Sequence, residues 1–286
     1  MCIRDRVKDR PYDHDVTLDV APRAAVTLLR FMTPTEITLS LLLSLQAPGR
    51  SPHAKIFLET CDETCQQAPR CGEPVLWCHP PKWSGRHGGF YRYETWTEGV
   101  DRYQRIAALT VDVAAGAKRE GRWLGSERAL VRLMATVMAH ESGFRRDVHE
   151  GRTRGDCDYT TIGGERTVIA GSCKSHCLGQ VQVVGDDRTA RGYNGNDLVG
   201  LDDASTRRCL ETVSDLLAGA HKACVAQRNG KVGTYPACTM GIYGGVASWR
   251  SDARIAKRAK TYHTLGARSR RPKPLSDEVR SALRER

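Results

Sequence analysis

One stretch decides the fold, Ser126-Glu127-Arg128-Ala129-Leu130-Val131-Arg132-Leu133-Met134-Ala135-Thr136-Val137-Met138-Ala139-His140-Glu141-Ser142-Gly143-Phe144. Apolar residues recur along it at helical spacing behind a suitable N-cap, so it predicts a helix that ends near Glu141. One helical face carries Glu141 together with Met138, Val137, Met134 and Leu130. The carboxylate is therefore expected to project from the buried face, where burial favours the protonated form that a general acid needs. The alternative is a Glu beyond the frayed helix end that points into water.

The composition is that of a protein with an ordinary hydrophobic core. A chain of 286 residues, 40% hydrophobic, is long enough for one medium domain with appendages or for two small domains. No segment approaches the ~20 apolar residues of a membrane span. Residues 250–286 hold twelve Lys and Arg against four Asp and Glu, so this tail supplies +8 of the net charge of +11. The excess predicts attraction to a polyanion such as an anionic envelope polymer, and a solvated tail without a partner is the alternative.

The longest apolar segment lies near the N-terminus. Residues 37–47 hold seven apolar residues out of eleven and no charge. They follow Met32 and precede Pro48-Gly49, which predicts a signal peptide over 32–47 with cleavage after Ala47. A buried helix is the alternative interpretation. If translation starts at Met32, residues 1–31 lie upstream of the true start and are not native, so they are given no structural role.

Cysteine usage indicates the compartment. An even set of cysteines downstream of a signal-like segment predicts disulfides, and therefore a periplasmic or secreted protein. Zinc is the competing explanation, because Cys61-x3-Cys65 and Cys173-x3-Cys177 have spacings that a metal can use. Residues 48–97 are rich in Cys, Pro and Gly and predict an irregular Cys-rich N-terminal segment. The set is Cys61, Cys65, Cys71, Cys78, Cys157, Cys173, Cys177, Cys209, Cys224 and Cys238.

Residues 98–265 predict a mainly α domain with one small β-hairpin. Two β-branched runs around Gly163-Gly164 give the hairpin over 159–169. Residues 266–286, rich in Arg and Pro, are expected to form a basic disordered tail, in which a terminal helical turn after Ser276 is left open. Helices are expected over 98–118, 126–141, 203–227, 237–243 and 251–265.

The order of these features resembles the soluble lytic transglycosylases and the related goose-type lysozymes. In that family a Glu-Ser pair ends the catalytic helix, a Gly-Leu-x-Gln motif follows the hairpin, and an Ala-Tyr-Asn motif comes late. Here Glu141-Ser142 is intact, Leu178-Gly179-Gln180 follows with Cys177 in place of the Gly, and Tyr243 is followed by Gly244 in place of the Asn. The match covers roughly residues 98–265 and implies a lysozyme-like helical domain.

The resemblance also implies an activity, cleavage of the MurNAc-β-1,4-GlcNAc bond of peptidoglycan without a cofactor or metal, by a monomer. Glu141 would first act as the acid, and then, once ionised, accept the proton of the muramyl 6-hydroxyl as a 1,6-anhydro ring closes. By the same resemblance Ser142 and Gln180 would line the substrate groove, and Tyr243 would orient Glu141. Each of these residues has a plainer interpretation. Ser142 would satisfy backbone groups at the helix end, Gln180 would be an ordinary loop amide, and Tyr243 would be a core aromatic with a satisfied hydroxyl.

Other functions stay open on the sequence alone. A lysozyme-type hydrolase needs a second carboxylate, and the loop after the helix offers four whose surface ion pairing is the simpler explanation: Asp147, Glu150, Asp156 and Asp158. His149 and His176 lie nearby, with no partner evident in the sequence. A non-catalytic peptidoglycan-binding module is a second hypothesis, and a zinc-dependent basic nucleic-acid binder is a third.

Overall fold

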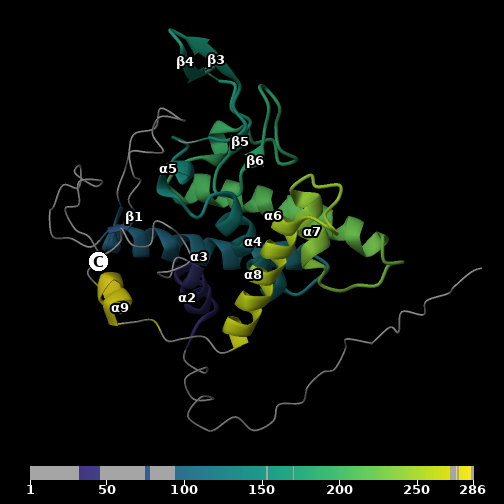
Figure 1. The fold of residues 1–286 in the computed structure, drawn as a ribbon. Coiled ribbons are helices and arrows are strands. Elements are labelled where there is room, and N and C mark those ends of the chain that lie inside the picture. Colours follow the sequence, from purple (N-terminus) through teal and green to yellow (C-terminus); the bar gives the residue numbers. More distant parts are fainter. Residues whose placement is uncertain are drawn as a thin grey trace, which may run out of the picture. The chain divides into compact units, whose positions relative to one another are not determined.

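The computed structural model describes residues 32–45, 75–77, 94–152, 154–169, 171–270, 275 and 277–284. Those from Thr33 onward belong to one compact unit. The described part of the chain is mainly helical, and its sheets are all two-stranded (Figure 1). This confirms the mainly α prediction.

The helices follow in the order α2 (Pro34–Leu45), α3 (Trp96–Arg119), α4 (Glu127–Glu141), α5 (Arg146–His149), the 3₁₀ helix η4 (Asn196–Leu198), α6 (Asp203–Ala226), α7 (Pro236–Tyr243), α8 (Ala253–Arg270) and α9 (Asp277–Arg284). The strands are β1 (Val75–Trp77), β2 (Glu94–Thr95), β3 (Tyr159–Ile162), β4 (Glu165–Val168), β5 (Ser175–His176) and β6 (Val181–Gln182). They pair as three antiparallel ladders, β1 with β2, β3 with β4, and β5 with β6.

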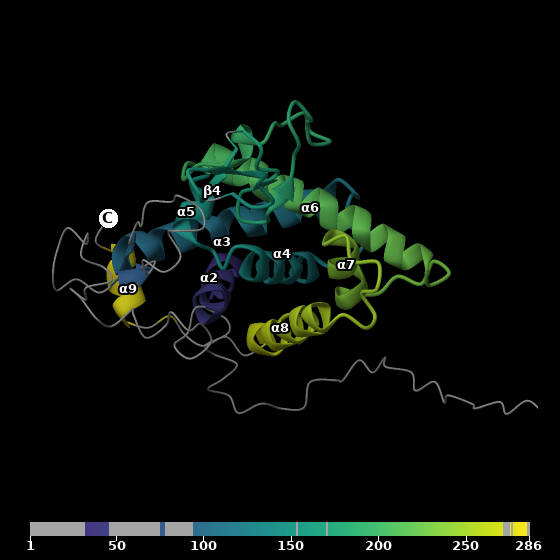
Figure 2. The ribbon, with the colours of Figure 1, turned by 45° about the horizontal axis from the view of Figure 1, so that its top comes forward.

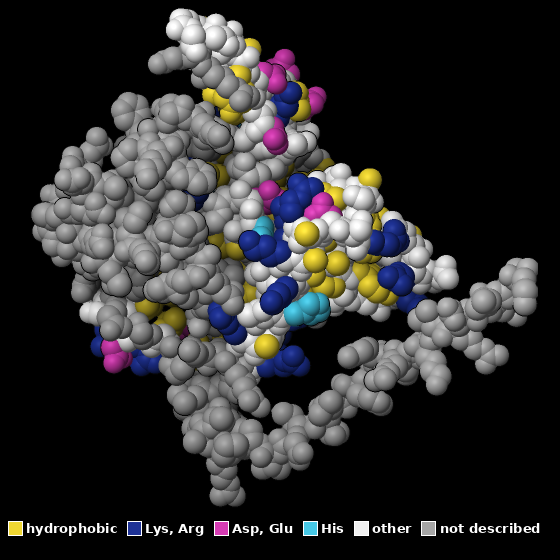
Figure 3. All heavy atoms as spheres, viewed as in Figure 1, with side chains coloured by type: hydrophobic (Ala, Val, Ile, Leu, Met, Phe, Trp, Pro, Cys, Tyr) yellow, Lys and Arg dark blue, Asp and Glu magenta, His cyan; other side chains and the backbone are white. Residues whose placement is uncertain are grey.

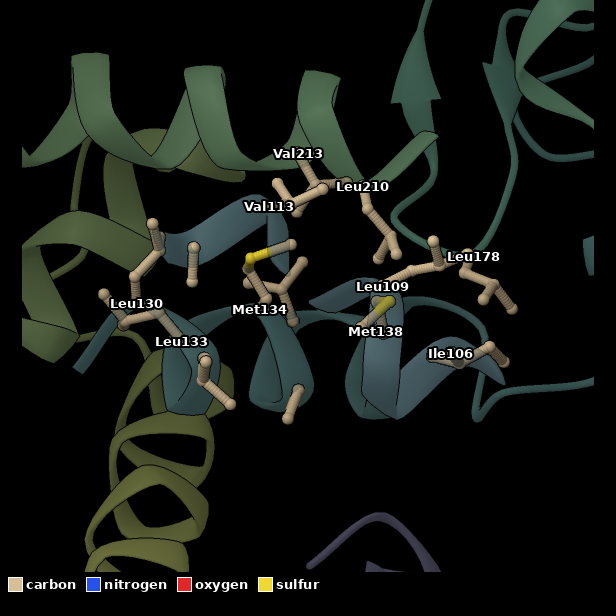
Figure 4. Packing of buried hydrophobic residues seen from close by; sticks show 14 of the residues in the cluster. Ile106, Leu109, Val113, Leu130, Leu133, Met134, Met138, Leu178, Leu210 and Val213 are labelled. Carbon is tan, nitrogen blue, oxygen red and sulfur yellow. The ribbon is translucent and has the colours of Figure 1, made fainter. Parts of the chain in front are cut away.

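Helix α4 lies at the centre of the helical packing. It contacts α3, α6, α7 and α8, and Figures 1 and 2 both show α8 running beside it. Met134 and Met138 are fully buried, and Figure 4 shows their side chains among apolar groups of the neighbouring helices, including Leu109 and Leu210. The predicted apolar stripe of α4 is thus confirmed, since all four of its members are buried.

Local sequence signals set the ends of the two main helices. The Ser126 hydroxyl accepts a hydrogen bond from the Ala129 amide and begins α4. The Asp202 carboxylate accepts from the Ser205 amide and begins α6. Each cap satisfies an N–H that the first helical turn leaves without an intrahelical partner. Both helices begin as the sequence predicts.

The predicted hairpin is present as β3 and β4. The register pairs Tyr159 with Val168 and Ile162 with Glu165, which leaves Gly163-Gly164 as a two-residue turn. Both glycines have positive φ, of 59° and 86°. That conformation matches the twist of a tight hairpin and is strained for most other residues.

The apolar segment near the N-terminus forms α2, which packs against α3. Leu39, Leu41 and Leu42 are buried in the same hydrophobic cluster as α3 and α4. This is the packing expected of a core helix, the alternative given above, while cleavage after Ala47 stays a prediction. Among the described residues, no helix combines the length and the apolar character needed to cross a bilayer.

The C-terminal region is more helical than the sequence indicated. Helix α8 continues past the expected end at Leu265 to Arg270, and α9 occupies residues that the prediction placed in a disordered tail. The continuation has a packing reason. Leu265 and Gly266 are buried, and a Cβ at Gly266 would lie 2.2 Å from the Arg132 guanidinium of α4. The disorder prediction is therefore wrong for 266–270, and α9 forms where a helical turn after Ser276 was left open.

Three disulfides join described cysteines: Cys157–Cys173, Cys177–Cys209 and Cys224–Cys238. They support an oxidising compartment. Cys173 and Cys177 have different partners, so the zinc interpretation of that pair is wrong. Cys61, Cys65, Cys71 and Cys78 belong to the predicted Cys-rich segment and lie outside the described residues. No cluster of three or more potential metal ligands occurs within the part that the structure describes.

Candidate active site

Glu141 occupies the last position of α4, on the face that the sequence predicted. Its side chain is 21% exposed, so it is neither free in water nor fully enclosed. The residues three and four positions earlier, Met138 and Val137, are fully buried. The carboxylate therefore lies at the edge of the core, where the apolar stripe of α4 reaches the surface.

The partner of Glu141 was not predicted. The Arg258 guanidinium, from α8, donates a hydrogen bond of 2.6 Å to Glu141 Oε1 and forms an ion pair with it. Arg258 is itself only 15% exposed. The sequence does contain a signal for this pair, because Arg258 lies three residues after Ile255 and four before Tyr262, on the buried stripe of α8. A cation on an apolar stripe normally has a buried counter-charge.

Tyr243 connects this helix end to the Leu178-Gly179-Gln180 segment. Its hydroxyl donates a 2.7 Å hydrogen bond to the carbonyl of Gly179. Burial raises the pKa of the Tyr243 hydroxyl above its usual range, and the negative charge of Glu141 raises it further. Tyr243 therefore stays neutral and lies close enough to Glu141 to sense its charge. Among the described residues, no direct hydrogen bond joins these two side chains, so the predicted orientation of Glu141 by Tyr243 stays a prediction.

The segment from Cys177 to Gln180 forms a tight loop between β5 and β6. Both end residues have left-handed backbone angles, with φ of 56° at Cys177 and 50° at Gln180. The Gln180 amide N–H and its side-chain Nε2 both donate to the Cys177 carbonyl, at 3.0 and 3.1 Å. Non-glycine residues in this region cost free energy and persist only where the surroundings hold them. Here the disulfide to Cys209 of α6 holds the first of them.

Close packing positions this loop on both sides. A Cβ at Gly179 would lie 2.3 Å from Val213 of α6 and 2.9 Å from the Tyr243 hydroxyl, so only glycine fits there. A Cβ at Gly155 would lie 2.5 Å from Gln180 Oε1. The amide of Gln180 is therefore half-buried, with its Nε2 committed to the backbone of its own loop.

Ser142 has a local role in the structure. Its hydroxyl donates to the Met138 carbonyl at 3.0 Å and accepts from the Phe144 amide at 3.2 Å. Both bonds satisfy backbone groups at the end of α4, and the side chain is buried. This is the plainer of the two interpretations given for Ser142. A contact between its hydroxyl and a substrate stays a prediction.

The histidines near the helix end are structural in their contacts. His140 shares a 3.0 Å hydrogen bond with Thr261 of α8, and burial lowers its pKa to about 4, with Arg258 and Lys257 adding to the effect. Burial also lowers the pKa values of His149 and His176. Their Nε2 atoms lie 2.9 Å from the Thr206 hydroxyl and 3.2 Å from the Val183 carbonyl, respectively.

Of the four loop carboxylates, three are paired with cations. Asp147 pairs with Arg145, Glu150 with Arg146 and Arg152, and Asp158 with Lys174. The fourth, Asp156, is exposed and accepts hydrogen bonds from the Ser175 hydroxyl and the Gln182 amide.

A shallow hollow of about 470 Å³ lies on the hairpin rather than at Glu141. Its lining comes from the hairpin and the disulfide below it: Cys157, Asp158, Tyr159, Thr160, Thr161 and Gly164. None of the predicted site residues takes part in it.

Comparisons with protein-family models, with curated proteins and with solved structures found no match. The chemical interpretation therefore rests on the residues themselves. The negative charge of Glu141 acts on Tyr243, and the Tyr243 hydroxyl is bonded to Gly179 in the loop that precedes Gln180. The structure also adds Arg258, which the sequence analysis missed.

Proposed function

We propose that this chain is a peptidoglycan lytic transglycosylase that cleaves the MurNAc-β-1,4-GlcNAc bond with Glu141 as its acid and base. One observation carries the proposal. The hydroxyl of Tyr243 bonds to Gly179 while its ring lies within the field of Glu141, so the end of α4, the Leu178-Gly179-Gln180 loop and α7 converge. These are the three elements on which the resemblance to the soluble lytic transglycosylases depends.

The backbone at Cys177 adds support. The family motif has glycine at this position, and Cys177 adopts the left-handed conformation that glycine adopts without strain. A loop of the same shape would follow, with the Cys177–Cys209 disulfide supplying the constraint that permits a cysteine there. The departure from the motif at this position is therefore compatible with a similar loop.

The carboxylates near the helix end favour transglycosylation over hydrolysis. A hydrolase requires a second carboxylate that is available to activate water or to act as the nucleophile. Asp147, Glu150 and Asp158 are paired with cations, and Asp156 accepts hydrogen bonds from the Ser175 hydroxyl and the Gln182 side-chain amide. In the transglycosylase route the N-acetyl group of the substrate assists bond cleavage, and one carboxyl group serves in both steps. Glu141 donates its proton to the leaving glycosidic oxygen and then accepts one from the muramyl 6-hydroxyl.

The ion pair with Arg258 favours a second candidate function. A carboxylate that accepts from a guanidinium is not ready to donate a proton, so a lysozyme-like domain with this pair kept closed would bind peptidoglycan without cleaving it. Such a binding module would sediment with sacculi and release no soluble sugars. Whether a substrate opens the pair therefore decides between the two functions.

Digestion of purified sacculi tests the proposal. The wild-type protein should release muropeptides with 1,6-anhydro ends, which differ by one water from the reducing ends that hydrolysis leaves. Glu141→Gln should release none. Glu127→Gln is a matched control, because Glu127 is exposed in the first turn of the same helix. Release by Glu141→Gln at the wild-type rate would reject the proposal. Sedimentation of the wild-type protein without release would favour the binding module.

A further inference from the structure

Helix α8 carries a dense positive charge beside the candidate site. Between residues 253 and 270 it has six Lys and Arg and no Asp or Glu. In Figure 3 the surface over α8 shows dark blue and cyan side chains. Arg254 is neutralised by Asp252, at 2.7 Å. Lys257 and Lys260 are exposed and form no ion pair or side-chain hydrogen bond within the described part of the chain.

Arg258 differs from these cations because it is turned toward α4. The Arg258 side chain is 15% exposed and the Glu141 side chain is 21% exposed, so both side chains are partly accessible to solvent. Among the residues that the structure describes, Glu141 Oε1 is the one hydrogen-bond partner of the Arg258 side chain. Lys257 lies near enough to act, together with Arg258, on the charge state of His140, the neighbour of Glu141. Two cations of α8 thus border the end of α4.

We propose that Arg258 is the receptor for a carboxylate of the substrate, and that binding of this carboxylate draws Arg258 away from Glu141. The inference rests on the proposed function. A guanidinium offers a planar fork of donors that matches a carboxylate. A second carboxylate can therefore replace Glu141 with no loss of hydrogen bonds to Arg258. Glu141, released from the cation, can then take up a proton from solvent water and donate it to the leaving oxygen.

The chemistry selects one class of glycan. Peptidoglycan strands bear stem peptides with free carboxylates, whereas a chitin-like strand of N-acetylglucosamine is neutral. Only the former can exchange with Glu141 for Arg258, so Glu141 remains paired with Arg258 in the presence of neutral glycans. The site would thus be specific for peptide-bearing strands, and Lys257 would add attraction at its rim.

Gly244 leaves room for this movement. A Cβ at Gly244 would lie 3.6 Å from Arg258 Nη1 and 3.4 Å from the Met240 carbonyl, in ordinary contact with both. A longer side chain would extend into the space beside the guanidinium. Where the family motif has Asn, this chain has Gly244, and the Arg258 guanidinium lies beside it.

The test uses full-length protein and sacculi freed of phosphate polymers with hydrofluoric acid. Half of the sacculi are amidated with carbodiimide and ethanolamine, which neutralises their carboxylates. Cosedimentation of the Glu141→Gln variant measures binding without turnover. Arg258→Gln and Arg258→Lys, each combined with Glu141→Gln, test whether Arg258 binds the substrate carboxylate. Arg254→Gln is the control, since Arg254 lies on the same helix and is already paired with Asp252.

Glu141→Gln should bind native sacculi about tenfold more tightly than amidated sacculi, which is the discrimination expected for one charge-assisted contact. The Glu141→Gln/Arg258→Gln variant should lose this preference for native sacculi. The Glu141→Gln/Arg258→Lys variant should retain part of the preference, and the Glu141→Gln/Arg254→Gln variant should retain all of it. Equal binding of both sacculi by Glu141→Gln, or a preference that survives Arg258→Gln, would overturn the inference. Circular dichroism and thermal melting verify that each variant is folded.

Cleavage distinguishes this inference from the proposed function. In the Glu141-containing protein, Arg258→Gln should digest native and amidated sacculi at similar rates, whereas the wild type should prefer native sacculi. If only Glu141→Gln abolishes release and the preference survives Arg258→Gln, the proposed function stands and the inference fails. If Glu141→Gln retains wild-type release, the proposed function itself fails.

Discussion

Removal of the Cys177–Cys209 disulfide should destabilise the protein and disturb the Leu178-Gly179-Gln180 loop. The bond joins residues separated by 32 positions. The loop-closure entropy for such a length gives about 3.7 kcal/mol at 25 °C. Cys177→Ala/Cys209→Ala is therefore expected to lower the free energy of unfolding by about this amount.

The left-handed backbone at Cys177 allows a sharper comparison. With φ at 56°, alanine is strained there and glycine is not. Without the disulfide, glycine at 177 should recover about 1 kcal/mol relative to alanine in the folded state, although glycine also gives the unfolded chain more freedom. Cys177→Gly/Cys209→Ala should accordingly be at least as stable as Cys177→Ala/Cys209→Ala. In an ordinary helix or strand the order would be reversed.

Urea unfolding followed by circular dichroism measures both effects under non-reducing conditions. The control is Cys157→Ala/Cys173→Ala, whose loop of separation 16 gives about 3 kcal/mol by the same relation. The control should lose similar stability but retain muropeptide release, because its bond lies at the hairpin. A loss below about 1 kcal/mol for Cys177→Ala/Cys209→Ala, or a glycine variant clearly less stable than the alanine one, would refute the reasoning.

Three further predictions concern the helix end and its core. Because the pKa of His140 falls from 6.5 to about 4 in the folded protein, the unfolded chain binds the proton first as the pH drops. Wild-type stability should therefore decrease between pH 6.5 and 4 by at most about 3 kcal/mol from this group, and His140→Gln should show a correspondingly smaller decrease in urea titrations. Met138→Ala should lower the free energy of unfolding by about 3 kcal/mol, measured by urea unfolding, because truncation of this fully buried side chain leaves a cavity in the core. Tyr243→Phe removes the bond to Gly179, and should cost about 1 kcal/mol and slow muropeptide release from sacculi.

The elements that the sequence predicts well are those with local causes. The apolar period of α4, its Ser126 cap and the Gly163-Gly164 turn each act within a few residues, and each is found where it was expected. Helix α6 belongs to the same class, because it begins at Asp203, as predicted. Helical and hairpin periodicities are local properties, so no knowledge of the tertiary fold is needed to recognise them.

The parts that the sequence missed depend on packing between distant segments. Helix α8 extends to Arg270 because Leu265 and Gly266 pack against α4, which no local rule contains. The apolar segment of α2 has the composition of a signal and also the packing of a core helix, since both require the same leucines. The disulfide partners are likewise set by tertiary proximity, and ten cysteines allow many pairings.

The pairing of Glu141 with Arg258 shows how far a buried acid can be inferred from one helix. The stripe of α4 predicted a carboxylate that projects from the buried face, and the structure places it at the edge of the core, with its side chain 21% exposed. The charge state of a carboxylate also depends on every element that reaches it. A cation 117 positions away in the sequence is one such element. The arginine itself was visible, on an apolar stripe of α8 where a lone cation needs a counter-charge. A stripe that carries an acid and a second stripe that carries a base should therefore be considered together, because burying both together avoids the cost of burying either charge alone. Applied here, that rule marks α8 as a partner for α4, alongside α3, whose Arg102 is also buried. It replaces the expectation of an isolated protonated acid with that of an ion pair, which opens in the catalysis proposed above.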